Sequence, residues 1–231
     1  MLMPVFDPIS QKIIDQQPRE LIHQCGLWHK SVQAHLIREN TQGQLEIFVQ
    51  ERSEYVDISC CKLDQSLATQ MIIQDDNNSE QALARGLWEE LRIIKYRSCY
   101  LPLKLWIIKE YAQHPGILNR EMLSLFIVSS YQQPNISYCK KIKNGYWMLW
   151  SKFVKLVINN NHSFTKTAQM YMLNPQIVNC IKEYSWAHIR RMNLPISKVF
   201  SIHHLAQFDN MGKHRFNQYI SLKALRSQIQ L

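Results

Sequence analysis

The clearest helical pattern in the chain is Ser79-Glu80-Gln81-Ala82-Leu83-Ala84-Arg85-Gly86-Leu87-Trp88-Glu89-Glu90-Leu91-Arg92-Ile93. Leucines recur at every fourth position, 83, 87 and 91, which is the spacing of one face of an α-helix. Asp and Asn residues precede it, and Ser79 is a favourable N-cap. We therefore predict an amphipathic helix over residues 79–92. Gly86 costs such a helix about 1 kcal/mol relative to alanine, so the glycine is expected to have a structural reason or to mark the loss of one.

Two β-type segments precede this helix, at residues 31–37 and 45–51. The second alternates apolar and polar residues, and the polar segment between them, residues 39–43, ends in a glycine. This arrangement predicts a β-hairpin. Residues 57–74 have a mixed composition that indicates loops with short strands.

Downstream of the helix, the apolar run at residues 121–129 has the length of a strand. Asn144-Gly145 predicts a turn. Ser151 is a candidate N-cap for the next helix, whose apolar face holds Phe153, Leu156 and Val157. Strands and helices that do not alternate strictly predict an α+β fold with a mixed sheet.

A further helix is expected to open at Asn174-Pro175, which combine an N-cap residue with a proline at the first helical position. One face of this helix carries Ile177, Ile181, Tyr184 and His188. Beyond Pro195 the pattern is irregular and ends in a weak helix from Ser221.

The charge of the chain is unevenly distributed around a net value of +9. Residues 1–138 contain 13 Lys or Arg and 16 Asp or Glu, whereas residues 139–231 contain 14 Lys or Arg and only two acids. This asymmetry favours an anionic partner for the second half, and the alternative is an ordinary solvated surface. Lysines and arginines there alternate with aromatic residues, a mixture that suits nucleic acid, although the sequence contains no recognisable nucleic-acid-binding motif. The basic residues concerned are Lys140, Lys141, Lys143, Lys152, Lys155, Lys166, Arg190 and Arg191.

The six cysteines are scattered and form no CxxC pair, so we expect reduced, mostly buried thiols and no zinc site. No segment approaches the roughly 20 apolar residues of a membrane span, and residues 1–17 lack the basic cluster of a signal peptide. These features predict a cytoplasmic protein. The adjacent His203 and His204 are expected to be a surface pair rather than a metal site.

Three segments resemble the Nudix superfamily, in the branch related to isopentenyl-diphosphate isomerase: Gly26-Leu27-Trp28-His29-Lys30-Ser31-Val32, Gly43-Gln44-Leu45 and Gln50-Glu51-Arg52-Ser53. The helix at 79–93 resembles the helical half of the Nudix box, G-x5-E-x7-R-E-U-x-E-E-x-G-U, where U is aliphatic. Asn119-Arg120-Glu121 and Gly145-Tyr146-Trp147 resemble further elements of the branch. The resemblance implies a Nudix-like α/β/α sandwich over residues 1–170, followed by a basic, mainly helical extension over residues 171–231.

The box itself is degenerate. Aligned without gaps, its glycines fall on Met71 and Arg92, and two of its glutamates fall on Asn77 and Gly86. In the family, carboxylates at positions 86 and 90 leave the same helix face and share Mg²⁺. Gly86 removes one of this pair, so half of a metal site remains.

The charged box residues that survive are Arg85, Glu89 and Glu90. The resemblance implies that Glu89 and Glu90 hold Mg²⁺ or Mn²⁺ or position the attacking water, with Arg85 orienting them. Glu121 is a candidate third carboxylate. The alternatives are solvated carboxylates for Glu89 and Glu90, a structural ion pair for Arg85 and a strand-edge charge for Glu121.

Two functions follow from the resemblance. One is a metal-dependent hydrolase that cleaves a diphosphate linkage in a phosphorylated small molecule. The other is a catalytically inactive Nudix fold that binds a ligand, a protein or a nucleic acid. Isomerase activity is not expected, because residues 66–72 contain neither the cysteine nor the histidine on which that chemistry relies.

Overall fold

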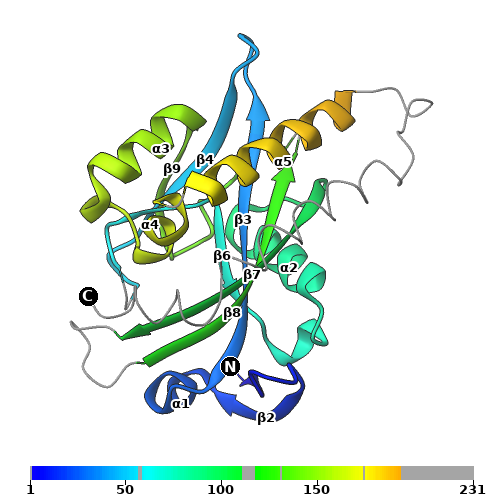
Figure 1. Cartoon of the computed structure of the whole chain (residues 1–231), viewed down its shortest axis with the longest axis vertical. Coiled ribbons are helices and arrows are strands. Elements are labelled where there is room, and N and C mark those ends of the chain that lie inside the picture. Colours follow the sequence, from blue (N-terminus) through cyan, green and yellow to red (C-terminus); the bar gives the residue numbers. More distant parts are fainter. Residues whose placement is uncertain (1, 57–58, 111–117, 131, 174, 194–231) are drawn as a thin grey trace. The chain divides into compact units, whose positions relative to one another are not determined.

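The computed structural model describes residues 2–56, 59–110, 118–130, 132–173 and 175–193. Its centre is a mixed seven-stranded sheet with the order β5-β4-β3-β8-β7, to which β6 adds beside β3 and β9 beside β4 (Figure 1). The strands are β3 (Trp28–Glu39), β4 (Leu45–Arg52), β5 (Leu63–Asp64), β6 (Leu67–Gln70), β7 (Arg97–Glu110), β8 (Leu118–Ser129) and β9 (Ile142–Leu149). Strands β3 and β8 run parallel, and the other pairs are antiparallel. The α+β class with a mixed sheet is therefore confirmed.

A smaller sheet and several helices complete this part of the chain. Strands β1 (Leu2–Phe6) and β2 (Ile13–Pro18) form a two-stranded sheet. The helices are α1 (Arg19–Cys25), α2 (Ser79–Leu91), α3 (Trp150–Asn159), α4 (Lys166–Met172) and α5 (Pro175–Asn193), with short 3₁₀ turns η1 (Ile73–Asp75) and η2 (Asn161–Ser163).

Helix α2 covers one face of the large sheet. Its leucines and alanine pack against alternate residues of β3 and β8, because successive side chains of a strand point to opposite faces. Together these side chains form one buried cluster that includes Val32, Ala34, Leu36, Ala82, Leu83, Leu87, Leu91, Phe126 and Val128. The predicted helix and its apolar face are confirmed.

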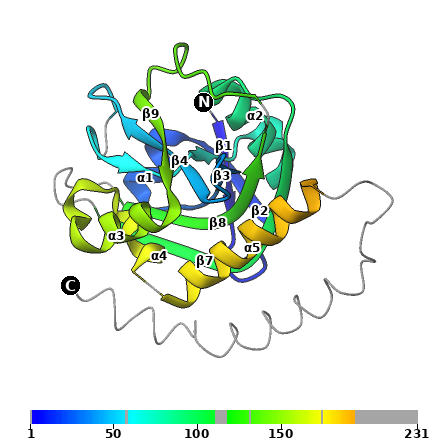
Figure 2. The same cartoon turned by 90° about the horizontal axis from the view of Figure 1, so that it is seen from above.

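Helices α3 and α5 lie on the opposite face (Figure 2). Ser129 Oγ at the end of β8 forms a 2.7 Å hydrogen bond with Nε2 of His188 on α5. The ring of Trp150, which begins α3, meets the His35 ring edge-on at 6.1 Å. Ser129 and His35 are the strand neighbours of Val128 and Ala34, so their side chains point away from α2. The sheet is thus covered by helices on both faces.

The hairpin predicted from residues 31–51 is formed by β3 and β4. Its register pairs Ile37 with Ile47 and Glu39 with Leu45. The expected short strands in the following segment are β5 and β6, and the strand expected at 121–129 is the main part of β8.

The predicted turn at Asn144-Gly145 is wrong. Both residues lie inside β9, where Asn144 pairs with Glu51 and Gly145 pairs with Gln50. Gly145 lies directly on the Phe48 ring, with which a Cβ atom at this position would clash. The glycine here serves close packing across the strands rather than a reversal of the chain.

The predicted helix caps also need correction. The N-cap of α2 is Asn78 rather than Ser79, and its Oδ1 accepts hydrogen bonds from the backbone N–H groups of Glu80 and Gln81 at 2.8 and 3.4 Å. Helix α3 begins at Trp150, one residue before Ser151, and no side chain caps it. Phe153 and Val157 are buried on its apolar face as expected.

The expectation of mostly buried thiols is wrong as well. Cys25, Cys60 and Cys61 are exposed, and Cys99, Cys139 and Cys180 are half-buried. None of the six forms a disulfide.

Helix α5 begins at Pro175 as predicted, and Ile177, Ile181 and His188 are buried on one face of it. Its proposed cap Asn174, the histidines at 203–204 and the weak helix from Ser221 lie outside the described residues. Among the helices that are described, none is long and apolar enough to cross a membrane.

Candidate functional site

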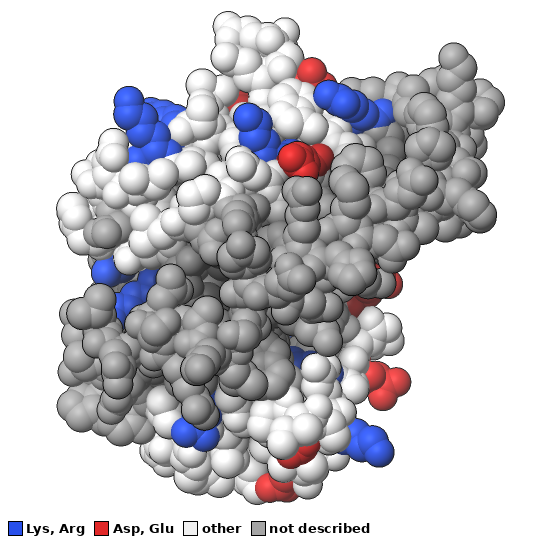
Figure 3. All heavy atoms as spheres, in the orientation of Figure 1, with Lys and Arg blue, Asp and Glu red and all other residues white. Residues whose placement is uncertain are grey.

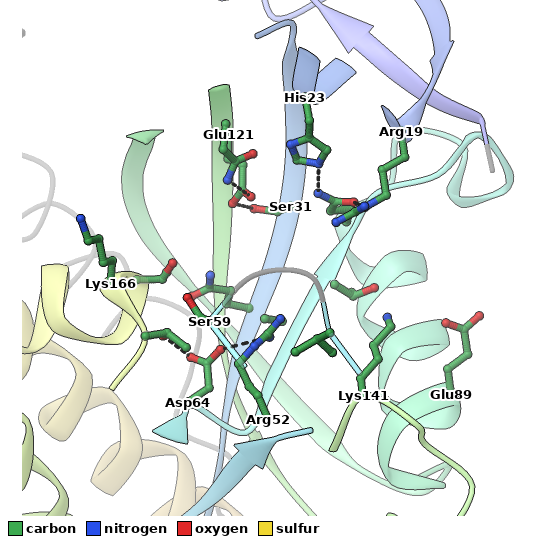
Figure 4. A pocket seen from close by; sticks show the side chains of 18 of the residues that line it. Arg19, His23, Ser31, Arg52, Ser59, Asp64, Glu89, Glu121, Lys141 and Lys166 are labelled. Atoms are coloured by element: carbon green, nitrogen blue, oxygen red, sulfur yellow. Dashed lines mark hydrogen bonds and ion pairs between the residues drawn. The ribbon is translucent and has the colours of Figure 1, made fainter. Parts of the chain in front are cut away.

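A polar cavity of about 480 Å³ opens beside β3, β6 and β8 (Figure 4). Side chains from α1, α2 and α4, and Lys141 just before β9, also reach it. Cationic side chains outnumber carboxylates in its lining, which includes Arg19, Arg52, Arg85, Lys141 and Lys166 together with Asp64, Glu89 and Glu121. A hollow with this balance of charge is suited to an anionic ligand.

Arg85 joins helix α2 to the turn that precedes it. Its Nε and Nη2 donate to the two carboxylate oxygens of Asp75 at 2.9 and 2.8 Å, and Nη2 also donates to the backbone oxygen of Gln70 at 2.8 Å. Its Nη1 pairs with Glu89 one helical turn away at 3.1 Å. Burial opposes the charge of Arg85, but the buried Asp75 carboxylate outweighs it and raises the pKa of the guanidinium. The bidentate pair with Asp75 favours the structural interpretation of Arg85.

Glu90 lies on the buried side of α2 and is paired with a lysine. Its side chain is 4% exposed, and Lys141 Nζ, just before β9, lies 3.3 Å from Glu90 Oε1. Burial raises the pKa of Glu90, while Lys141 and, more weakly, Arg52 act to lower it. The carboxylate that would hold a metal by resemblance is therefore in contact with a protein cation.

Glu89 faces the cavity and is accessible. Its side chain is 49% exposed, and Arg85 is its ion-pair partner. Glu89 is thus the surviving box carboxylate that solvent and ligand can reach most readily.

Glu121 also lines the cavity, from β8. Ser31 Oγ donates to its Oε2 at 2.8 Å and Asn119 Nδ2 donates to its Oε1 at 2.6 Å. His29 Nε2 lies 3.7 Å from Oε1. Glu121 therefore belongs to a hydrogen-bonded cluster of β3 and β8, whereas Glu89 and Glu90 belong to α2.

Gln70 of β6 extends this cluster towards α1. Its Nε2 lies 3.0 Å from His23 Nε2 and 3.4 Å from His29 Nε2, and Arg19 Nε donates to its Oε1 at 3.1 Å. Burial, helped by His29 and Arg19, lowers the pKa of His23 to about 4. His23 is therefore neutral near pH 7 and can share a hydrogen bond with the amide.

Arg52 of β4 and Asp64 of β5 form a second pair of charged residues in the lining of the cavity. Arg52 Nη1 lies 3.6 Å from Asp64 Oδ2, and Thr165 Oγ1 donates to Asp64 Oδ1 at 2.8 Å. Sequence reasoning did not single out Asp64, Gln70 or His23, because they come from short or irregular segments without a motif. Lys141 appeared in the sequence only as one member of a basic set.

Gly86 is glycine because α2 approaches β6 closely. A Cβ atom at position 86 would lie 2.8 Å from Thr69 Cγ2 and 3.3 Å from both Leu67 Cδ atoms. The carboxylate that the box would place here has no room in this packing.

These residues do not fit the divalent metal that the resemblance implies. The first carboxylate is replaced by Gly86, Glu90 contacts Lys141, and Glu121 is held by Ser31 and Asn119. Within the described part of the chain, no three His, Cys, Asp or Glu side chains are grouped so that they could hold a metal ion. Octahedral Mg²⁺ requires several oxygen ligands at once.

Comparison with known proteins identifies the fold. No protein-family model and no curated protein matches the sequence. DR0079 from Deinococcus radiodurans matches with a TM-score of 0.53 at 16% identity, over 74% of this chain and 97% of that chain. A NUDIX hydrolase from Alicyclobacillus acidocaldarius matches with a TM-score of 0.48 at 11% identity, over 66% and 91% of the two chains. The NUDIX domain of Shewanella oneidensis NrtR, complexed with ADP ribose, matches with a TM-score of 0.46 at 14% identity, over 78% and 93%. At 16% identity the similarity to DR0079 concerns the fold alone, which is a mixed α+β architecture.

Proposed function

We propose that this protein binds a phosphorylated small molecule, such as a nucleoside diphosphate derivative, in the cavity and does not hydrolyse it. The observation that carries this proposal is the contact between Glu90 and Lys141. In a hydrolase, a carboxylate at the position of Glu90 would have to bind a metal ion, whereas here it binds the ammonium group of Lys141. The cavity retains the cationic lining that a phosphate group requires. Fold alone does not establish catalysis.

The test combines binding with turnover on the intact chain. ADP-ribose, a nucleoside diphosphate sugar, is titrated into the protein by calorimetry, and the same mixture is incubated with Mg²⁺ or Mn²⁺ and separated by ion-exchange chromatography. We expect measurable binding and no AMP or ribose phosphate. Metal-dependent product formation that is lost in the Glu89→Gln variant would overturn the inactive interpretation.

A second candidate is the hydrolase itself, cleaving a diphosphate linkage with Mg²⁺ or Mn²⁺. It is favoured by the position of Glu89 and Glu121, which line the same cavity. In this case Glu89, Glu90 and Glu121 would be the metal ligands, with Arg85 in a supporting role. Binding of Mn²⁺ that disappears in Glu90→Gln would support this candidate, and a titration without Mn²⁺ binding would count against it.

Other properties are proposed on the sequence alone. An anionic partner of the basic second half, with nucleic acid as one class, is tested by a filter-binding assay at several salt concentrations. We also propose a cytoplasmic location and no isomerase activity. We propose as well a domain over residues 1–170 and an extension over residues 171–231, a division that the stability of truncated chains tests.

A further inference from the structure

Glu90 and Lys141 form an ion pair at the boundary between protein interior and cavity. Glu90 is almost completely buried, whereas the Lys141 side chain is 60% exposed and lines the cavity. The carboxylate is therefore on the protein side of the pair and the lysine on the solvent side. A buried carboxylate is costly unless it is paired, so Glu90 holds the ammonium group at this place.

The ammonium group has the donors to contact a ligand as well. It carries three N–H donors, and one of them donates to Glu90 Oε1 at 3.3 Å. Arg52, which also lines the cavity, adds positive potential on the same side, as its effect on Glu90 shows. Two protein cations thus lie near Glu90, the carboxylate that the resemblance makes a metal ligand.

We propose that Lys141 takes the place of a divalent cation in this cavity, so that its ammonium group, held by Glu90, binds the phosphate of the ligand without any metal. This inference rests on the proposed function, because it presupposes that the cavity binds a phosphorylated molecule. It adds that binding is independent of Mg²⁺ and depends on one named lysine.

Lys143 provides a matched control two residues away. It pairs with Glu51 at 3.1 Å, and its side chain is similarly exposed. Residues lining the cavity include Lys141 but not Lys143. If the lysines acted only through the net charge of the protein, replacing either one would weaken anion binding equally. If Lys141 contacts the ligand directly, only the replacement of Lys141 would weaken binding.

The experiment measures the affinity of the full chain for ADP-ribose and for inorganic pyrophosphate by calorimetry, in EDTA and in Mg²⁺ at equal ionic strength. We expect the same affinity in both buffers. Lys141→Met is expected to weaken binding about tenfold or more, which corresponds to the loss of a charge-assisted hydrogen bond, and Lys143→Met to leave it unchanged. Glu90→Gln keeps the lysine and an oxygen that can accept its hydrogen bond, and it removes the opposing charge, so this variant should bind at least as strongly as the unmodified chain.

Lys141→Met leaves Glu90 buried without its partner, and this can destabilise the fold. The double variant Glu90→Gln/Lys141→Met removes both charges together and should fold, as checked by thermal melting, yet bind as weakly as Lys141→Met. Unchanged affinity in the folded double variant would overturn the inference. Binding that requires Mg²⁺ would overturn it too, while the proposed function would stand. No binding of either probe in either buffer would refute the proposed function and this inference with it.

Discussion

Gly86 lies where the packing of α2 against β6 leaves no room for a side chain. An alanine in a helix is normally about 1 kcal/mol more favourable than a glycine. Here the added methyl would lie 2.8 Å from Thr69 Cγ2, an atom on a short, branched side chain that cannot easily move away. Overpacking usually costs about 1–3 kcal/mol, and the helical preference for alanine offsets about 1 kcal/mol of this cost. We therefore expect Gly86→Ala to lower the free energy of unfolding by up to about 2 kcal/mol, as measured by urea denaturation.

The control for this prediction is Thr69→Ser, which deletes the obstructing methyl and keeps the hydroxyl that Arg85 contacts. In the Thr69→Ser background, Gly86→Ala should be neutral or stabilising. Equal destabilisation in both backgrounds would contradict the proposed close approach of α2 and β6.

His35 gives the fold a sensitivity to acid. Its complete burial lowers the pKa of the imidazole from 6.5 to about 3. His35 is therefore protonated below about pH 6.5 in the unfolded chain but only below about pH 3 in the folded chain. The contribution of neutral His35 to the free energy of unfolding is complete above pH 6.5 and is lost as the pH falls below that value. At pH 4 this loss amounts to about 3 kcal/mol. Comparing urea denaturation of the protein and His35→Phe between pH 7.5 and pH 4 measures it.

The variant should show a smaller loss of stability over this range. Some loss is expected to remain, because burial also lowers the pKa of His23, with the same sign. Parallel curves for the two proteins would show that His35 does not cause the effect.

The site illustrates what residue patterns reveal and what they omit. Glu89 and Glu90 were found because a helical motif fixes their spacing. The partner of Glu90 could not be found in this way, since Lys141 is 51 residues away and meets it only through the pairing of β9 with β4. Sequence spacing predicts contacts along one helix, whereas contacts between distant segments depend on register.

At the scale of elements, the N-terminus of α2 depends on a single amide. Asn78 Oδ1 accepts from two backbone N–H groups that would otherwise lack a helical partner. We expect Asn78→Ala to reduce the free energy of unfolding by about 1 kcal/mol, as measured by thermal melting followed by circular dichroism. Asn78→Asp retains the acceptor and should be nearly neutral, so a loss as large as that of Asn78→Ala would contradict this role.

Elements with strong periodicity were predictable, and the exceptions have physical causes. The hairpin, α2, β8 and α5 follow from alternating or helical apolar patterns. Asn144-Gly145 has the composition of a turn, but the Phe48 ring requires a glycine inside β9 at that point. The cap of α2 was misplaced by one residue because Asn78 and Ser79 are both good N-caps.

At the scale of the whole molecule, the basic residues of the second half that the structure describes lie in different surroundings. On the face shown in Figure 3, the basic and acidic side chains of the described residues are interspersed. Lys141 and Lys166 line the cavity, and Lys143 is paired with Glu51. Some of the lysines that make the second half basic thus line the cavity. Composition alone could not predict this, because it carries no information on where each lysine side chain points.

The position at which the folded unit ends depends on helix α5. Residues Met1–Ile189 form one compact unit, and α5 contributes to it the buried side chains Ile177, Ile181, Ser185, His188 and Ile189. A chain that ends at residue 170 would expose the surface these side chains cover and would leave Ser129 without its contact to His188. Burial of each isoleucine stabilises a fold by about 1.5–3 kcal/mol. We therefore expect the chain 1–170 to melt about 10 °C or more below the chain 1–193, as followed by differential scanning fluorimetry.

Ile181→Ala in the full chain tests the same contact without truncation and should lower the free energy of unfolding by about 2–5 kcal/mol. Equal melting temperatures for the two truncated chains would instead place the domain boundary at residue 170, because α5 would then add nothing to the stability of the sheet.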